Sequence, residues 1–170
     1  MMSKKFMPVI LFLTGASLFI AFKSQGNTEN NDNPKTKYAK ILRNIGLILE
    51  EGHFSPKKID DAFSKTVLYK FTAELDNDKN ILLQSDVESF KKYEDVVDDE
   101  IHGTKEIESF FSVNEAYQKR LKEVSVLYTE LLSKPFDFSA NESILLDPEK
   151  ISYPKTEEER KDRWRKGLNI

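Results

Sequence analysis

Cysteine is absent from the 170-residue chain, and glycine is scarce, with 6 residues. The lack of cysteine excludes disulfide bonds, thiolate zinc sites, a cysteine nucleophile and a lipid-modified N-terminal cysteine. The formal net charge of −3 provides no basic surface for nucleic acid, so we expect no such partner. Charged residues make up 32% of the chain, and phenylalanine occurs 12 times. This composition is typical of a helical domain with an aromatic core rather than of a disordered chain.

The first 26 residues have the layout of an export signal. Two lysines precede an uncharged apolar run, residues 6–22, as in a secretory signal peptide. Small residues stand at the −3 and −1 positions of a cut before residue 27. The run has 17 residues, about the lower limit for a membrane span, so residues 1–26 are predicted to be a signal peptide or an N-terminal anchor. Their removal would take away three lysines and no acid, and the net charge would fall from −3 to −6.

The remainder of the chain is therefore expected to be exported, and residues 6–22 would tether it to a membrane if they were not removed. The polar residues 27–34, NTENNDNP, end in proline and are predicted to be a flexible linker. Residues 35–170 are predicted to form the folded domain.

Apolar residues recur at helical spacing in this domain, and no strand-like alternation of useful length occurs. The fold class is therefore all-α, with about five helices in an irregular, orthogonal or bundle-like arrangement. The predicted helices cover residues 36–51, 56–75, 85–103, 105–133 and 157–170. Residues 135–155 are predicted to be extended or irregular, because two prolines there exclude regular helix.

Capping residues define these boundaries. N-caps are predicted at Ser55 before Pro56, at Ser85 with Glu88, and at Thr156 with Glu159. Gly52 is the predicted C-cap of the first helix. Asp76–Asp78 should end the second helix, because short polar side chains compete for backbone hydrogen bonds.

Few residues suggest chemistry. Asp76–Asn80 has acids at alternate positions like a calcium loop, but Ile81 stands where glycine is needed and Val87 where a bidentate glutamate is needed. This segment is interpreted as a turn. His53 and His102 each lie near a helix end, far apart in sequence, and are interpreted as surface or capping residues.

The acidic run Asp98–Glu100, with Glu94 and Asp95 before it, is interpreted as a solvated helix surface rather than an acid–base pair. Ser55 and Ser85 are assigned as caps, and no glycine-rich turn suits a serine nucleophile with a lysine base. No catalytic, cofactor-binding or metal-binding residue is assigned, and no cofactor is expected.

Trp164 lies between two arginines near the end of the chain. Three roles compete for it: core packing, cation–π stacking, and contact with another domain. An amphipathic helix that ends with tryptophan usually needs a surface to pack against, so Trp164 is the first candidate for an inter-domain contact.

The order of motifs resembles the N-terminal helical domain of tail-specific (C-terminal-processing) serine proteases, in a Bacteroidetes-like version. The motifs are S-P at 55–56, L-D-N-D-K at 75–79, Q-S-D at 84–86, Y-Q-K-R-L at 117–121, K-P-F-D-F at 134–138 and E-E-E-R-K-D-R-W at 157–164. Together they cover roughly residues 35–170.

The resemblance implies that a PDZ domain and a protease domain with a Ser–Lys dyad follow this domain. It also implies a periplasmic endopeptidase acting on proteins with apolar C-termini, in which the helical domain encloses substrate and contacts an adaptor protein. The chain ends before any PDZ or catalytic segment, so it is expected to be inactive alone. The alternative is a stand-alone exported helical adaptor or binding module.

Overall fold

The computed structural model describes residues 33–137, 139 and 141–169. The predicted export signal, residues 1–26, and most of the predicted linker lie outside the described residues. The chain divides into two units, Met1–Pro34 and Lys35–Ile170. The helices among the described residues belong to the second unit, apart from Pro34, the first residue of the first described helix.

The described residues form an all-α fold, which confirms the predicted class. Six α-helices occur among them: α2 (Pro34–Leu47), α3 (Asp61–Leu75), α4 (Gln84–Phe90), α5 (Val97–His102), α6 (Ser109–Leu132) and α7 (Glu157–Leu168). A π-helical turn, η1 (Ile48–Gly52), continues α2, and a 3-10 turn, η2 (Lys91–Tyr93), continues α4. Within this described part, no strand occurs and no helix is long and apolar enough to cross a membrane.

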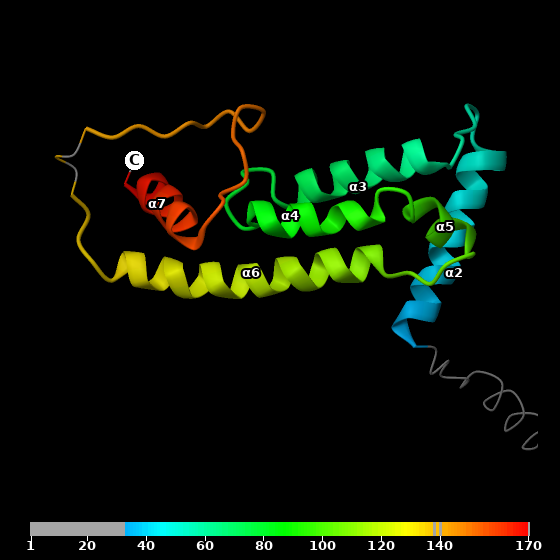
Figure 1. Cartoon of the computed structure of the whole chain (residues 1–170), viewed down its shortest axis with the longest axis horizontal. Coiled ribbons are helices and arrows are strands. Elements are labelled where there is room, and N and C mark those ends of the chain that lie inside the picture. The colour runs from blue at the N-terminus through cyan, green and yellow to red at the C-terminus, as the bar shows by residue number, and fades with distance from the viewer. Residues whose placement is uncertain (1–32, 138, 140, 170) are drawn as a thin grey trace, which may run out of the picture. The chain divides into compact units, whose positions relative to one another are not determined.

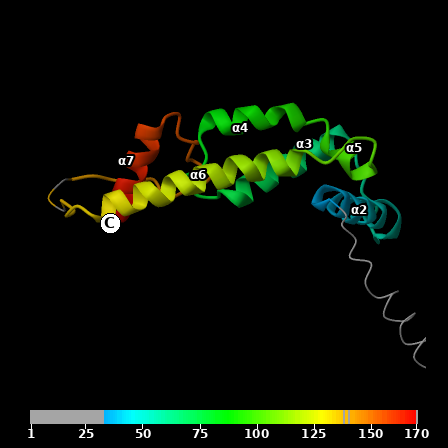
Figure 2. The same cartoon turned by 90° about the horizontal axis from the view of Figure 1, so that it is seen from below.

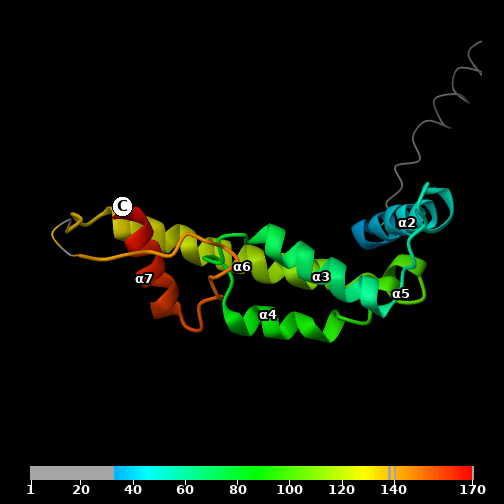
Figure 3. The same cartoon turned by 90° about the horizontal axis from the view of Figure 1, so that it is seen from above.

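Helices α3, α4 and α6 lie side by side in the second unit, with α7 near one end of this layer and α2 and α5 at the other (Figure 1). The views from below and above keep α6 next to both α3 and α4 (Figure 2, Figure 3). The buried core lies between them and consists of Ile59, Leu68, Leu82, Phe90, Tyr93, Val97, Ile101 and Val113. The layer thus buries one apolar stripe of each long helix.

The predicted start of the second helix at Ser55 and Pro56 is wrong. Helix α3 begins at Asp61, and the carboxylate of Asp60 accepts the Phe63 N–H at 3.1 Å as its N-cap. Residues 53–59 are not helical, and this segment places Ile59 in the core with 5% of its surface exposed. Burial of one isoleucine therefore outweighs the local preference of Ser-Pro for a helix start.

The predicted third helix is broken into α4, η2 and α5, and its capping box is wrong. The Asp86 carboxylate accepts the Leu83 N–H at 2.9 Å, so α4 begins at Gln84 and Ser85 lies exposed in its first turn. Helix α5 starts separately because the hydroxyl of Ser64 on α3 accepts the Asp98 N–H at 2.7 Å. A bond between distant segments determines this helix start.

Helix α6 begins at Ser109, four residues later than predicted. The Glu100 carboxylate, 1% exposed, accepts the N–H groups of Glu108 and Ser109, each at 2.9 Å. It thereby satisfies two of the free amides at the start of α6 and favours the positive end of the helix dipole. The predicted end of α3 at Asp76 and the Thr156 cap of α7 are confirmed.

Gly46 marks the close approach of α2 to α5, and we expect Gly46→Ala to destabilise the domain by about 1–3 kcal/mol. A Cβ at Gly46 would lie 2.4 Å from Cγ2 of Ile101, a β-branched residue with little rotamer freedom. The measurement is urea unfolding followed by circular dichroism. The matched control is Gly52→Ala, whose Cβ would meet nothing closer than 3.8 Å. Equal stabilities for the two variants would show that the α2–α5 contact is not tight.

Candidate functional site

The turn after α3 is organised by one carboxylate. Asp76 is 3% exposed, and its side-chain oxygens accept the backbone N–H groups of Asn80 at 3.1 Å, Ile81 at 3.1 Å and Leu82 at 2.8 Å. These bonds fold residues 76–82 back on the end of α3. Asp76 thus fixes backbone amides, as expected of a turn residue.

Lys79 connects this turn to the segment before α7. Its backbone is left-handed, with φ of 49°, and its ammonium donates to the carbonyl oxygens of Pro148 at 2.7 Å and Ile151 at 2.6 Å. A left-handed non-glycine residue costs roughly 1–2 kcal/mol. The two ammonium bonds offset this cost and hold the irregular segment, residues 145–155, against the turn.

Helix α7 binds the carbonyl oxygens of the same turn. Arg160 donates to the oxygen of Ile81 at 2.7 Å, and the Trp164 indole N–H donates to the oxygen of Asn80 at 2.7 Å. Arg163 donates to the oxygen of Lys79. We call residues 79–81 the docking turn. The three donors lie at i, i+3 and i+4, so they share one face of α7.

Two arginines join α7 to α6 and α4. Arg120 on α6 forms a bidentate pair with Asp86 at 2.7 and 3.1 Å, and it also binds Glu123 at 2.9 Å and Glu157 at 2.7 Å. Arg160, 1% exposed, shares both glutamates, with Glu123 at 2.9 Å. We call these five residues the arginine cluster. It connects three helices through charge-assisted hydrogen bonds, which are stronger than neutral ones.

The two arginines of this cluster lower the pKa of the Glu123 carboxyl. Burial alone would raise the pKa of its carboxyl, but hydrogen bonds from Arg160 and Arg120 outweigh burial and lower the pKa below its usual value. The carboxylate oxygens around Arg120, Asp86 first, raise the pKa of its guanidinium, with burial acting the other way. The two arginines thus favour the carboxylate form of Glu123.

The structure brings together residues from four motifs that lie far apart in the sequence. The docking turn and the arginine cluster are surrounded by residues of all four motifs: Asp76 and Lys79, Asp86, Arg120, and Arg160 with Trp164. Sequence reasoning singled out only Trp164 as a contact residue and missed Arg160 and Arg120. The sequence does contain a signal for Arg160. It follows three glutamates and lies three and four residues before Arg163 and Trp164, which is the spacing of one helix face.

Trp164 is partly buried, and its ring meets that of Tyr128 edge-on at 6.2 Å between centroids. Trp164 thus contacts Asn80 and Tyr128 of its own domain. Its role as a contact with another domain stays a prediction, which its remaining exposed surface permits.

The structure places the two histidines apart. The Nδ1 atom of His53 lies 2.7 Å from the Ser55 carbonyl oxygen, and Nε2 of His102 lies 3.1 Å from the Glu50 carboxylate. Neither histidine takes part in a cluster of three or more metal-ligating side chains among the described residues. Ser55 and Ser85 both lie exposed on the surface.

The acidic run does not behave as a uniform solvated surface. Hydrogen bonds to Asp99 from Lys105, which is 2.8 Å away, and from Thr104 hold the pKa of its carboxyl below its usual range. Asp98 accepts the Ser64 hydroxyl at 2.6 Å. Glu100 is buried, contrary to the predicted solvated surface, because its carboxylate caps α6. It also accepts the Ser109 hydroxyl. Its oxygens therefore serve structure rather than proton transfer.

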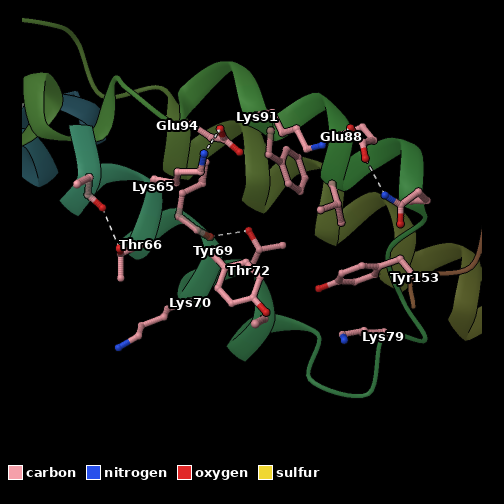
Figure 4. Close-up of a pocket in the computed structure, with 16 residues that line it drawn as sticks. Lys65, Thr66, Tyr69, Lys70, Thr72, Lys79, Glu88, Lys91, Glu94 and Tyr153 are labelled. Atoms are coloured by element: carbon pink, nitrogen blue, oxygen red, sulfur yellow. Dashed lines mark hydrogen bonds and ion pairs between the residues drawn. The ribbon is translucent and has the colours of Figure 1, made fainter. Parts of the chain in front are cut away.

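A groove of ≈ 740 Å³ runs between α3 and α4. Its walls carry Lys65, Tyr69, Lys91 and Glu94, and Tyr153 and Lys79 close one end, whereas the side chain of Lys70 points away from the groove (Figure 4). We call it the α3–α4 groove. A smaller groove of ≈ 290 Å³, lined almost wholly by apolar side chains, lies between α2, α3 and the start of α6. The larger groove combines an apolar floor with polar walls, as ligand sites do.

The hydroxyl of Tyr153 should ionise late. Burial, and then the negative charge of Asp76, raise the pKa of Tyr153 from 10.0 to about 12. Between pH 10 and 12 the unfolded chain releases this proton while the folded chain keeps it, so stability should fall as pH rises through this window and be unaffected below it. The measurement is urea unfolding from pH 7 to the alkaline limit, and Tyr153→Phe should lose stability less steeply above pH 10. Identical slopes would contradict the assignment.

Comparison with known proteins agrees with this architecture. A family model described as the tail-specific protease N-terminal domain matches residues 46–170. The match covers most of the chain, so the chain belongs to this family of helical domains. Most of α2 precedes the matched residues.

One curated relative is the tail-specific protease of Haemophilus influenzae. It is 28% identical over 117 residues, which make up 68% of this chain and 17% of the relative. The chain thus spans about 17% of the length of that relative.

Proposed function

We propose that this chain is the scaffold and substrate-enclosing N-terminal domain of a periplasmic C-terminal-processing serine endopeptidase, and that it is not catalytic by itself. Its partners would be the downstream PDZ and protease domains, protein substrates with apolar C-termini, and an adaptor protein. The relative named above is itself called a tail-specific protease, and it is much longer than this chain.

The observation that carries the proposal is the convergence of four of the six motifs on the docking turn and the arginine cluster. The docking turn and the arginine cluster hold α7 against the rest of the domain. Buried Arg160 takes part in both, because it binds the Ile81 carbonyl oxygen and the Glu123 carboxylate. A helix held in this way transmits a fixed orientation to whatever follows it, which is what a scaffold domain requires. The motif side chains in this network are thus engaged in positioning α7.

The predicted export signal supports the proposed cellular location. Residues 1–26 have the layout of a signal peptide or anchor, and a signal of this kind would deliver the domain to the periplasm or tether it to the inner membrane. The alternative function is a stand-alone exported adaptor or binding module, and the α3–α4 groove is the feature that favours it.

The test is an immunoblot of fractionated source cells with an antibody to this domain. We expect a periplasmic or membrane-tethered band far above the 19.7 kDa of this chain. The immunoprecipitated protein should cleave a reporter with an apolar C-terminus and spare a matched reporter with a charged one. The isolated chain should cleave neither. A single band at or just under 19.7 kDa would instead support the adaptor, and cleavage by the isolated chain would refute its non-catalytic role.

A further inference from the structure

The smaller groove, between α2, α3 and the start of α6, presents apolar surface that no described residue covers. Its volume is ≈ 290 Å³, and apart from Tyr38, Glu100 and Ser109 the side chains that line it are hydrocarbons. Four large lining side chains remain well exposed: Tyr38 at 47%, Ile41 at 46%, Ile45 at 48% and Phe110 at 42%. We call this feature the α2 groove. Exposed apolar surface that gathers in a groove is typical of a ligand site.

The polar side chains of the α2 groove other than Tyr38 are engaged with each other and with the start of α6. Glu100 is 1% exposed, and its carboxylate accepts the N–H groups of Glu108 and Ser109 at 2.9 Å. It also accepts the Ser109 hydroxyl. The groove therefore offers mainly hydrocarbon along its length, and a polar group placed there would lose its hydrogen bonds to water. The part of a ligand that lies in the groove must be apolar.

Positive charge lies at the Tyr38 end of the groove. The ring of Tyr38 is 6.5 Å from that of Phe110 and 6.2 Å from that of Phe111. The ammonium of Lys35 is 5.5 Å from the centre of the Phe111 ring. Residues 34–49 contain four bases and no acid, although the whole chain has a net charge of −3. The free N–H groups of the first turn of α2 add the positive end of the helix dipole, so this end favours an anionic group.

The volume of the groove fits one hydrocarbon chain. An apolar cavity of about 150 Å³ binds benzene, which has six carbons, so ≈ 290 Å³ has room for roughly ten to twelve carbons. One turn of α-helix, about 10–12 Å wide with a pitch of 5.4 Å, fills roughly 500 Å³, which excludes a helix of a partner protein. Along α2, Tyr38 and Ile45 are about 10 Å apart at 1.5 Å per residue, close to the length of an extended alkyl chain of that size.

We propose that the α2 groove binds a medium-chain fatty acid. Its alkyl chain packs on Ile41 and Ile45, and its carboxylate lies at the Lys35 end, away from the like charge of Glu100. The inference goes beyond the proposed function and does not depend on it, because Ile41 and Ile45 precede residues 46–170, which match the family model.

The test is isothermal titration calorimetry of the 170-residue chain with sodium octanoate, decanoate and dodecanoate below their micellar concentrations. We expect saturable binding whose affinity rises about fourfold for each added CH₂ group, because each buried CH₂ contributes about 0.8 kcal/mol. Uncharged decanol should bind several-fold more weakly than decanoate. Lys35→Gln should weaken the binding of decanoate and leave that of decanol unchanged.

Ile41→Gln and Ile45→Gln should each weaken the binding of decanoate and decanol alike, since they make the wall of the groove polar. Leu132→Gln is the matched control, because Leu132 is 48% exposed on α6 and lies outside the groove. It should bind both ligands normally. Thermal unfolding followed by circular dichroism verifies that each variant is folded, as we expect of substitutions at exposed positions.

Three results would overturn the proposal. One is the absence of saturable binding up to about 1 mM decanoate, and another is equal weakening by Ile45→Gln and Leu132→Gln. The third is binding to phosphatidylglycerol vesicles, or self-association in sedimentation, that Ile45→Gln abolishes while monomeric decanoate fails to bind. That result would make a lipid surface or a second copy the occupant. The immunoblot that tests the proposed function is independent of all three.

Discussion

Arg160→Ala should destabilise the domain by about 3–5 kcal/mol, because it removes one partner from a buried ionic network. Arg160 is 1% exposed and binds Glu123, Glu157 and the Ile81 carbonyl oxygen. Its loss leaves Arg120 as the remaining arginine of the cluster beside the carboxylates of Glu123 and Glu157. It also removes the hydrogen bond from the middle of α7 to the docking turn. The stability is measured by urea unfolding.

The same variant has a local readout. Trp164 is the only tryptophan in the chain, and its indole donates to the docking turn one helical turn away from Arg160. Separation of α7 from the docking turn should therefore shift the fluorescence emission of Trp164 to longer wavelength before the remaining helices unfold. Coincident transitions by fluorescence and circular dichroism would mean that α7 unfolds with the whole domain.

Arg165→Ala is the matched control on the same helix. Arg165 pairs with Glu142 at 2.6 Å and Asp162 at 2.8 Å, but its side chain is 38% exposed. Exposed ion pairs contribute about 0–1 kcal/mol, so the control should remain close to wild type. A loss as large as that of Arg160→Ala would show that burial does not distinguish the two arginines.

Asp76→Ala should have a comparably large effect, also about 3–5 kcal/mol, because three backbone N–H groups lose their acceptor and each unsatisfied group costs about 1–3 kcal/mol. The side chain is 3% exposed, so water replaces its oxygens only after the turn opens. Asp76→Asn keeps one acceptor oxygen and should fall between wild type and Asp76→Ala. Thermal unfolding of the three proteins gives the comparison.

Asp78→Ala is the control within the same turn. Asp78 is exposed, and its carboxylate accepts one hydrogen bond, at 3.3 Å, from the side-chain amide of Asn77. Its loss should change stability by less than about 0.5 kcal/mol. Because the side chains of Asp76 and Arg160 both bind the backbone of Ile81, the double variant should be less destabilised than the sum of the two single effects. Strict additivity would mean that the turn and α7 are not coupled.

The elements that the sequence predicted well are those with strong local signals. The long helix α6, the end of α3 at Asp76 and the Thr156 cap of α7 each depend on residues within a few positions of one another. Apolar periodicity and short polar caps act over one or two turns, so they can be read without knowing the fold. The all-α class follows from the same signals.

The wrong boundaries share one cause. Helix α3 starts late because Ile59 enters the core, α5 starts where Ser64 accepts an amide, and α6 starts where Glu100 does. Each decisive partner lies on another element, and Ser-Pro or Ser-x-x-Glu patterns contain no information about it. Tertiary burial then outweighs a local preference of about 1 kcal/mol.

The candidate site divides in the same way. By itself the sequence determined the helical class, the absence of thiol chemistry and the family motifs, while the inter-domain contact of Trp164 stays a prediction. Only the tertiary structure decided that Asp76, Asp86, Arg120 and Arg160 form one network and that Tyr153 closes one end of the α3–α4 groove. The physical reason is that these ion pairs and hydrogen bonds depend on distances between segments 34 to 84 residues apart, which no local pattern encodes.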